Sequence, residues 1–230
     1  MYDFLLFDAD GTLFDFDRAE REAVRETLAF YSLPHHDDIL TLYHTINASL
    51  WHDLEKGLIS KAELAVERFR RLLEQCGFSG DPCAVNRTYV GNLGQNAFLF
   101  EGALALCRRL SAQKSLYLVT NGVQTTQQSR FAKSGLLPYF SGVFVSEDAG
   151  APKPDIAFFE HVARNIPGYD PRRAVIIGDS LSSDIQGGNN AGIDTVWYNP
   201  ANLPCPQTPH CTYTVSDYTQ LYSILLSKGR

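Results

Sequence analysis

Short apolar runs alternate with segments of helical pattern through the second half of this chain of 230 residues. The apolar runs predict strands at 116–119, 143–145, 174–177 and 195–198. The segments beside them predict helices near 102–113, 123–135 and 182–191, and a further helix after Pro154. A Pro-rich loop at 200–209 and a closing helix over 221–226 complete the pattern. A further buried strand is predicted at residues 4–7. Such alternation is typical of a mostly parallel sheet with helices on both faces. The sequence therefore predicts an α/β fold with a doubly wound sheet.

A helical segment separates the first predicted strand from the others. From Asp17 to about residue 93 the pattern is helical and shows no strand. Two pairs resemble capping boxes at helix starts, Asp17 with Glu20 and Ser60 with Glu63. We therefore expect an inserted helical cap domain within a discontinuous core. The predicted boundaries are 1–14 and 99–230 for the core and 15–98 for the cap domain.

Two carboxylates, Asp8 and Asp10, follow directly on the predicted strand at residues 4–7. The carboxyl ends of the strands form the edge of an open α/β sheet at which ligands bind. Residues i and i+2 of an extended chain point the same way, so both side chains can address one small ligand. Gly11 then lets the chain turn away without placing a side chain in the crevice.

Three further polar groups stand in the same position, each after an apolar strand. They are Thr120-Asn121-Gly122, Lys153-Pro154 after the strand and loop at 143–152, and the segment from Gly178 to Asp184. Because the carboxyl ends of parallel strands meet at one edge, these groups are predicted to form one site with Asp8 and Asp10. Other roles stay open at this point, since Thr120 and Asp184 could cap helices and Lys153 could be a solvated lysine.

The order D-x-D-G-T, T-N-G, K-P and G-D-x-x-x-x-D resembles the four motifs of the haloacid dehalogenase superfamily of phosphatases. The similarity covers residues 1–14 and about 100–200, and the helical insertion stands where that family has its first-type cap. The resemblance implies a Rossmann-like core with strand order 3-2-1-4-5. The Mg²⁺ ligands that it implies are one oxygen of Asp8, the main-chain carbonyl of Asp10, and Asp179, with Asp184 outside the ligand sphere or holding Lys153.

The chemistry of these residue types fits the resemblance. A phosphate monoester and several carboxylates repel one another in a partly dry cleft, so a bound hard cation is expected, and we predict Mg²⁺. Asp8 is predicted to be the nucleophile that forms an aspartyl phosphate. Asp10 is predicted to protonate the departing oxygen and then to deprotonate the attacking water. The groups predicted to bind the phosphoryl oxygens are Thr120, the main-chain amides of Asn121 and Gly122, and Lys153.

The helical insertion is expected to recognise the leaving group. Its segments Leu50-Trp51-His52-Asp53, Gly57-Leu58-Ile59-Ser60 and Arg68-Phe69 resemble the cap of the pyrimidine 5′-nucleotidases in this superfamily. An aromatic face from Phe14, Phe16 or Trp51 is predicted to stack on the nucleobase. The alternative is that these rings pack the cap against the core. Lys56, in a predicted turn between cap helices, is a candidate substrate contact.

Composition excludes several classes of partner. The net charge of −6 disfavours binding to polymeric nucleic acid, which depends on many Lys and Arg contacts. No apolar run approaches the ~20 residues of a membrane span, and the start of the chain lacks a signal-peptide pattern. Five cysteines without a C-x-x-C pair suit free thiols in a reducing compartment. We therefore expect a cytoplasmic protein. Its expected state is a monomer or weak homodimer. The run at residues 35–38, His-His-Asp-Asp, is interpreted as a solvated turn rather than a metal site.

The predicted function is that of a hydrolase, the Mg²⁺-dependent cleavage of a pyrimidine nucleoside 5′-monophosphate to nucleoside and phosphate. A small-sugar phosphate or phosphoglycolate phosphatase shares every core residue and is the nearest alternative. A phosphomutase would use the same core but transfer phosphate between sugar carbons, and a non-catalytic phosphoester-binding module has no need of both Asp8 and Asp10. The cap is predicted to open and close about hinges near 14–16 and 96–101.

Overall fold

The computed structural model describes residues 2–226 and divides the chain into two compact units. The α/β unit holds Met1–Asp15, Leu99–Gln124 and Ser134–Arg230, and the helical unit holds Phe16–Phe98 and Thr125–Lys133. The sequence places residues 125–133 in the core, whereas the structure places them in the helical unit. Ser129 Oγ donates to the carbonyl of Gly94 at 2.7 Å, and Arg130 Nε donates to that of Asn96 at 3.2 Å.

Parallel strands form the sheet of the α/β unit. Within the described residues the strands are β1 (Phe4–Phe7), β2 (Ser115–Thr120), β3 (Gly142–Val145), β4 (Ala174–Gly178), β5 (Asp194–Tyr198) and β6 (Tyr213–Val215). Their order is β3-β2-β1-β4-β5-β6, and every neighbouring pair is parallel. The predicted doubly wound α/β fold is confirmed, and the first five strands have the order that the family resemblance implies.

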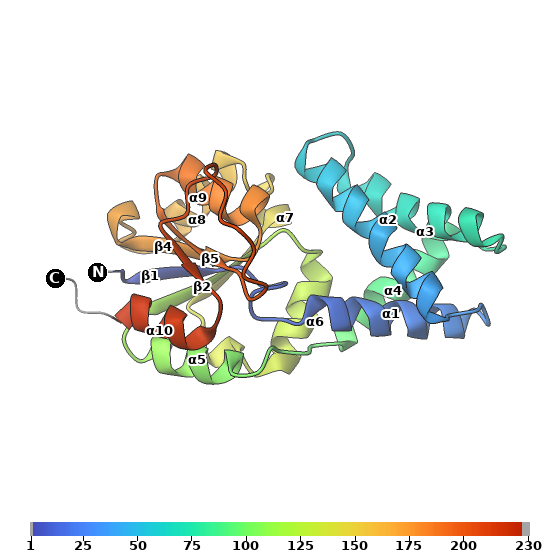
Figure 1. Ribbon diagram of the computed structural model, residues 1–230, viewed down its shortest axis with the longest axis horizontal. Helices are drawn as coiled ribbons and strands as arrows, with labels where there is room; N and C mark the ends of the chain where they lie inside the picture. The colour runs from blue at the N-terminus through green and yellow to red at the C-terminus, as the bar shows by residue number, and fades with distance from the viewer. Residues whose placement is uncertain (1, 227–230) are drawn as a thin grey trace. The chain divides into compact units, whose positions relative to one another are not determined.

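Helices cover both faces of this sheet. They are α5 (Ala103–Ser111), α7 (Ser146–Ala149), α8 (Ile156–Asn165), α9 (Gln186–Ala191) and α10 (Tyr218–Leu226), while α6 (Gln124–Ser134) spans the two units. Figure 1 shows α8 and α9 on one side of the strands and α5 and α10 on the other. Alternate strand residues such as Leu6, Val119 and Ile176 pack with Phe158 and Val162 of α8. Burying a side chain of this size contributes about 1.5–3 kcal/mol.

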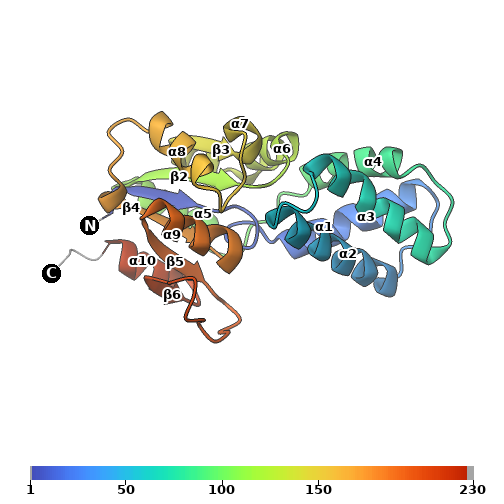
Figure 2. The same ribbon diagram turned by 90° about the horizontal axis from the view of Figure 1, so that it is seen from above.

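The strand β6 was not predicted. It lies beside β5 at the edge of the sheet (Figure 2) and pairs in parallel with residues 196–198. Reciprocal hydrogen bonds between the main-chain amides and hydroxyls of Thr195 and Thr212, at 3.1 and 3.0 Å, extend this pairing. Because β6 has three residues and buries only Val215, it is too short for an alternating pattern to be recognised.

The helical unit packs around aromatic side chains. Its helices are α1 (Phe16–Phe30), α2 (Asp37–Glu55), α3 (Lys61–Cys76) and α4 (Pro82–Gln95), joined by residues 125–133 of α6. The rings of Tyr43, Phe69 and Tyr89 meet in its core with centroids 5.1–5.4 Å apart. Ser60 and Glu63 form the predicted capping box at the start of α3. No helix in residues 2–226 is both long and apolar enough to cross a membrane.

The predicted capping box of Asp17 and Glu20 is wrong. The helix α1 begins at Phe16, so Asp17 already lies in its first turn. Glu20 is 2% exposed, and its carboxylate bonds with His44 Nδ1 and Asn47 Nδ2, both at 2.7 Å. A buried carboxylate needs polar partners of this kind, and here they come from α2 rather than from the start of α1.

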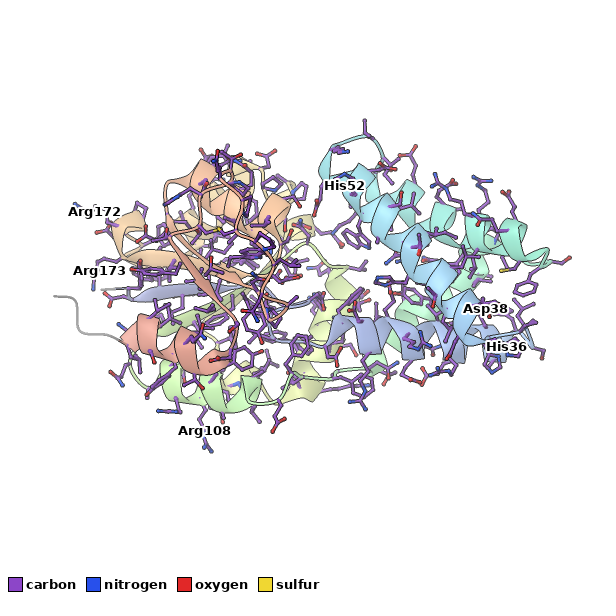
Figure 3. The ribbon with its side chains drawn as sticks, viewed as in Figure 1. His36, Asp38, His52, Arg108, Arg172 and Arg173 are labelled. Carbon is purple, nitrogen blue, oxygen red and sulfur yellow. The ribbon has the colours of Figure 1, made fainter. Side chains whose placement is uncertain are left out.

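The run of residues 35–38 is solvated, as interpreted, but it does not form a turn, because α2 already begins at Asp37. All four residues are exposed, and His36 precedes the helix without a capping bond from its side chain. Figure 3 shows His36 and Asp38 at one end of α2 and His52 near the other. Asp37 pairs with Arg21 at 2.7 Å. Among the residues that the structure describes, this run belongs to no cluster of metal-ligating side chains.

Candidate active site

The predicted core residues lie where the strands of the α/β unit end. The parallel register pairs the last residue of β1 with residues near the ends of β2 and β4. Asp8 follows directly on β1, and Asp179 follows directly on β4. Thr120 is the last residue of β2. The carboxyl edge of the sheet therefore brings Asp8 together with side chains that are more than 100 positions away in the sequence.

Lys153 lies at the centre of this edge. Its side chain is 1% exposed, and Nζ donates to Asp8 Oδ1 at 2.6 Å, to Asp184 Oδ1 at 2.6 Å and to the carbonyl of Val119 at 2.8 Å. An ammonium has three protons, so each of them has an acceptor. Lys153 is thus not a solvated lysine, and Asp184 holds it, as one of the alternatives implied.

Three carboxylates surround this one lysine. Asp8, Asp179 and Asp184 each present an oxygen, and these oxygens lie within 4.8 Å of one another. Asp179 is the most exposed of the three, while Asp8 and Asp184 are 7% and 1% exposed. Two negative charges therefore remain after Lys153 is counted, if all three carboxylates are ionised. Mg²⁺ prefers carboxylate oxygens, so this donor set fits the predicted cation.

The excess of carboxylates shifts the pKa values of the site. Burial raises the pKa of Asp8 well above its usual value, against the opposing effect of Lys153, and the charges of Asp184 and Asp179 add to the rise. Loss of hydration, together with the charge of Asp184, raises the pKa of Asp179 to about 7. Burial acts to lower the pKa of Lys153, but the charges of Asp184 and Asp8 outweigh it and raise that pKa. A bound cation would favour the ionised carboxylates.

Two glycines leave room for carboxylates of the site to lie against the main chain. Gly11 has φ +83°, and a Cβ placed there would stand 2.3 Å from Asp179 Oδ2. A Cβ on Gly178 would stand 2.1 Å from Asp184 Oδ2. Gly11 was predicted to make the turn, and its contact with Asp179 gives a second reason for glycine; the need for glycine at 178 was not predicted.

The T-N-G segment closes on itself and on Lys153. The hydroxyl of Thr120 accepts a hydrogen bond from the amide of Gly122 at 3.0 Å, and α6 begins only at Gln124, so Thr120 does not cap that helix. The Asn121 side chain donates to the carbonyl of Lys153 at 2.9 Å and accepts from its amide at 2.8 Å. The side chain of Asn121 thereby holds the main chain of Lys153, a contact that the sequence did not indicate.

Asp10 and Phe14 lie in the loop that follows β1. Their backbones form an isolated bridge, and Asp10 is half-buried. The carboxylate of Asp10 is outside the cluster of three, which agrees with its implied contribution of a main-chain carbonyl. Phe14 is 0% exposed. The prediction that Phe14 offers a face to a nucleobase is therefore corrected, because its ring is wholly enclosed by packing.

The other predicted substrate contacts belong to the helical unit. Phe16 and Trp51 are half-buried and pack against the core of that unit. The guanidinium of Arg130 lies 5.9 Å from the centroid of the Phe16 ring. Lys56 is exposed in the turn that ends α2. Packing covers only part of the Phe16 and Trp51 rings, and a role for Phe16, Trp51 or Lys56 in substrate binding stays a prediction.

The buried Lys153 is thus shared by carboxylates at the carboxyl edge of a parallel sheet, the edge at which ligands bind in such folds. A model of the haloacid dehalogenase-like hydrolase family matches residues 2–192. The chain belongs to this family.

Relatives of known name match nearly the whole chain. Pyrimidine 5′-nucleotidase PynA of Streptococcus pneumoniae is 42% identical over 225 residues, which cover 97% of this chain and 95% of PynA. Pyrimidine 5′-nucleotidase YjjG of Escherichia coli is 30% identical, with 97% and 98% covered. A crystal structure of the hydrolase YfnB of Bacillus subtilis, described as bound to magnesium and as revealing interdomain movement, is 40% identical. It superposes with a TM-score of 0.94 and covers 98% of this chain and 99% of YfnB.

Proposed function

We propose that this hydrolase removes phosphate from pyrimidine nucleoside 5′-monophosphates and that it uses Mg²⁺. The observation that carries the proposal is the position of the buried Lys153 between Asp8 and Asp184, with Asp179 beside them. The similarity to PynA and YjjG supports the choice of substrate. The magnesium in YfnB supports the choice of cation.

Asp8 is the proposed nucleophile. One of its oxygens forms a bond to phosphorus while the bond from phosphorus to the nucleoside 5′-oxygen breaks, which leaves an aspartyl phosphate on the enzyme. The Asp8 oxygen that accepts from Lys153 is held at 2.6 Å, so the orientation of the carboxylate is set before substrate arrives.

Asp10 is the proposed acid and base. Its proton passes to the departing 5′-oxygen, and its carboxylate then takes a proton from the water that attacks the phosphorus. The bond between phosphorus and the Asp8 oxygen breaks in this second displacement, so that free phosphate leaves and Asp8 is restored. Asp10 is half-buried, which is compatible with contact to water.

The groups that would hold Mg²⁺ are the carboxylates of Asp8 and Asp179 and the main-chain carbonyl of Asp10. When bound, the cation supplies positive charge that offsets the charge of the phosphate and of the carboxylates. Asp184 is assigned to holding Lys153, since its Oδ1 accepts from Nζ and its Oδ2 accepts from the amide of Ser180 at 3.2 Å.

The T-N-G segment is proposed to bind the phosphoryl oxygens. Thr120 supplies a hydroxyl, and Asn121 and Gly122 supply main-chain amides. The Gly122 amide donates to Thr120 Oγ1, so this proposal requires that amide to exchange its acceptor or to share its proton when phosphate binds. Lys153 adds positive charge where negative charge develops in the transition state.

The helical unit is proposed to act as the cap that recognises the nucleoside, with Trp51 and Lys56 as the candidate contacts. The chain passes between the units at 15/16, 98/99, 124/125 and 133/134, and the first two of these crossings lie within the segments predicted as hinges. The interdomain movement described for YfnB supports a cap that opens and closes. We also propose that the protein works as a monomer or weak homodimer in the cytoplasm, where its free cysteines would stay reduced.

Release of phosphate tests this function. It is measured with Mg²⁺ and with EDTA on pyrimidine and purine 5′-monophosphates, a 3′-monophosphate, phosphoglycolate and several sugar phosphates. The expected result is Mg²⁺-dependent release with the highest kcat/KM for the pyrimidine 5′-monophosphates. Preference for a small phosphate would reject the nucleotidase while keeping the core chemistry. Absence of Mg²⁺-dependent release from every compound would overturn the proposal.

A further inference from the structure

Two aromatic side chains outside the four motifs donate hydrogen bonds to the loops of the site. Trp197, on β5 and 3% exposed, donates from Nε1 to the carbonyl of Asp179 at 2.9 Å. Tyr218, the first residue of α10, donates from its hydroxyl to the carbonyl of Thr12 at 2.6 Å. One bond thus fixes the loop after β4, and the other fixes the loop after β1.

The two loops are also joined to each other. The hydroxyl of Thr12 donates to Asp179 Oδ1 at 3.3 Å. The ring of Tyr218 stacks on Tyr198, the neighbour of Trp197, with centroids 5.2 Å apart and an interplanar angle of 14°. The contacts therefore form a closed chain that runs from β5 to the Asp179 loop, across to the Thr12 loop, on to α10 and back to β5.

We propose that Trp197 and Tyr218 are positioning residues that hold these two loops in the geometry that binds Mg²⁺. The inference rests on the proposed function, because it concerns the same cation site. Partners outside the ligand sphere orient ligands, and their loss commonly weakens metal binding by about 10–100-fold. The bond from Trp197 ends on the main-chain carbonyl of the proposed ligand Asp179. The bond from Tyr218 ends on the carbonyl of Thr12, whose hydroxyl in turn donates to the Asp179 carboxylate.

Tyr218→Phe removes the hydroxyl that donates to the carbonyl of Thr12 and that also hydrogen-bonds with the side chain of Tyr198. It keeps the ring that stacks on Tyr198. Tyr222→Phe is the matched control, because it makes the same chemical change four residues later on α10. The ring of Tyr222 lies under Arg109 at 3.8 Å, and its hydroxyl has no hydrogen bond within residues 2–226. Trp197→Phe removes the bond to Asp179 in a second, independent variant.

The measurement is the Kd for Mg²⁺ alone, by isothermal titration calorimetry without substrate, with the unfolding midpoint in EDTA as the measure of stability. Tyr218→Phe is expected to raise the Kd about 10-fold and Trp197→Phe about 10-fold or more. Tyr222→Phe is expected to stay within about 2-fold of wild type, since it touches neither loop. Lowered stability with an unchanged Kd in Tyr218→Phe would overturn the inference, because a merely structural role predicts that result.

The proposed function and this inference fail in different ways. If wild type binds no Mg²⁺, or if Asp179→Asn binds it as tightly as wild type, the proposed cation site is wrong. If wild type binds Mg²⁺ and Asp179→Asn does not, but Tyr218→Phe matches Tyr222→Phe, the cation site stands and the positioning role is wrong. Tyr218→Phe decides the outcome even where Trp197→Phe fails to fold.

Discussion

In the helical unit a buried carboxylate, Glu20, is joined to a buried guanidinium, Arg68, through the amide side chain of Asn47. Asn47 donates to Glu20 at 2.7 Å and accepts from Arg68 at 3.4 Å. Asn86 accepts two further bonds from Arg68, at 3.1 and 2.7 Å. In the α/β unit, by contrast, three carboxylates share the single ammonium of Lys153.

The two arrangements differ in charge balance more than in burial. One negative and one positive group satisfy each other in the helical unit, and such a network serves the stability of the fold. A surplus of carboxylates destabilises a fold unless something else neutralises it, so it persists where a ligand of opposite charge binds. The comparison therefore assigns the Lys153 region to function and the Glu20 network to structure.

Asp8→Asn is expected to have the largest effect on turnover. Loss of the nucleophile should reduce phosphate release by on the order of 10⁴-fold or more, as for other enzymes whose nucleophile is removed. The same variant should raise the free energy of unfolding in EDTA, because it removes one of the surplus charges. Phosphate release and urea unfolding measure the two effects. If the variant were both inactive and less stable than wild type, the carboxylates around Lys153 would not be a surplus of charge that destabilises the fold.

Lys153→Met is expected to have the largest effect on stability. Three carboxylates would then face one another without a counter-charge, at a cost of about 3–5 kcal/mol in the free energy of unfolding. Urea unfolding in EDTA tests this expectation, with Lys56→Met at an exposed position as the control. Equal stability of the two variants would show that the lysine does not compensate the cluster.

Mg²⁺ itself should stabilise the wild-type protein. A ligand present at 100 times its Kd contributes about 2.7 kcal/mol. Thermal unfolding with Mg²⁺ and with EDTA should show this gain in wild type and little of it in Asp179→Asn. A full gain in Asp179→Asn would place the cation elsewhere.

Arg68→Met should lower stability while leaving the cation site intact. The carbonyl oxygens of Asn47 and Asn86 would lose a buried donor, at a cost of about 1–3 kcal/mol. The stabilisation by Mg²⁺, measured as in the previous experiment, should remain that of wild type. If the gain from Mg²⁺ fell as well, the assignment of this network to structure alone would have to be abandoned.

The pH dependence of the helical unit should be the smallest effect. The hydrogen bond to Glu20 raises the pKa of His44 above 6.5 in the folded state. The stabilisation is therefore complete below pH 6.5 and declines as pH rises through the raised pKa. Because the His44 side chain is 54% exposed, about a few tenths of a kcal/mol are expected. Urea unfolding between pH 6 and 8 should show this slope in wild type and a flatter one in His44→Asn.

The core of the site could be predicted from sequence because Asp8 and Asp179 follow directly on strands and Thr120 ends one. Asp8, Thr120 and Asp179 are placed by strand ends, and the parallel topology then brings them to one edge. The direction of a side chain is a different matter. The T-N-G motif shows that residue 121 is an asparagine, but not that its side chain turns to the main chain of a residue 32 positions later.

The features that were missed depend on contacts between distant segments. Glu20 lies at the spacing of a capping box, yet Asn47 and His44 of α2 draw its carboxylate inward. Phe14 is an aromatic residue of the kind that can stack on a nucleobase, and only the fold shows that its ring is buried. The strand β6 forms because it pairs with β5, and its own three residues show no strand pattern. In each case tertiary contacts outweigh the local pattern.

The assignment of residues 125–133 to the helical unit bears on how such a unit could pass from one protein to another. Recombination at 15/16 and 98/99 would transfer α1 to α4 and leave behind Ser129 and Arg130, which bond to Gly94 and Asn96. The transferred helices α1 to α4 would then have to pack against the α6 of the recipient protein. Exchange of specificity between relatives is therefore expected to succeed when α6 is inherited together with the cap, and to yield poorly folded chimaeras when it is not.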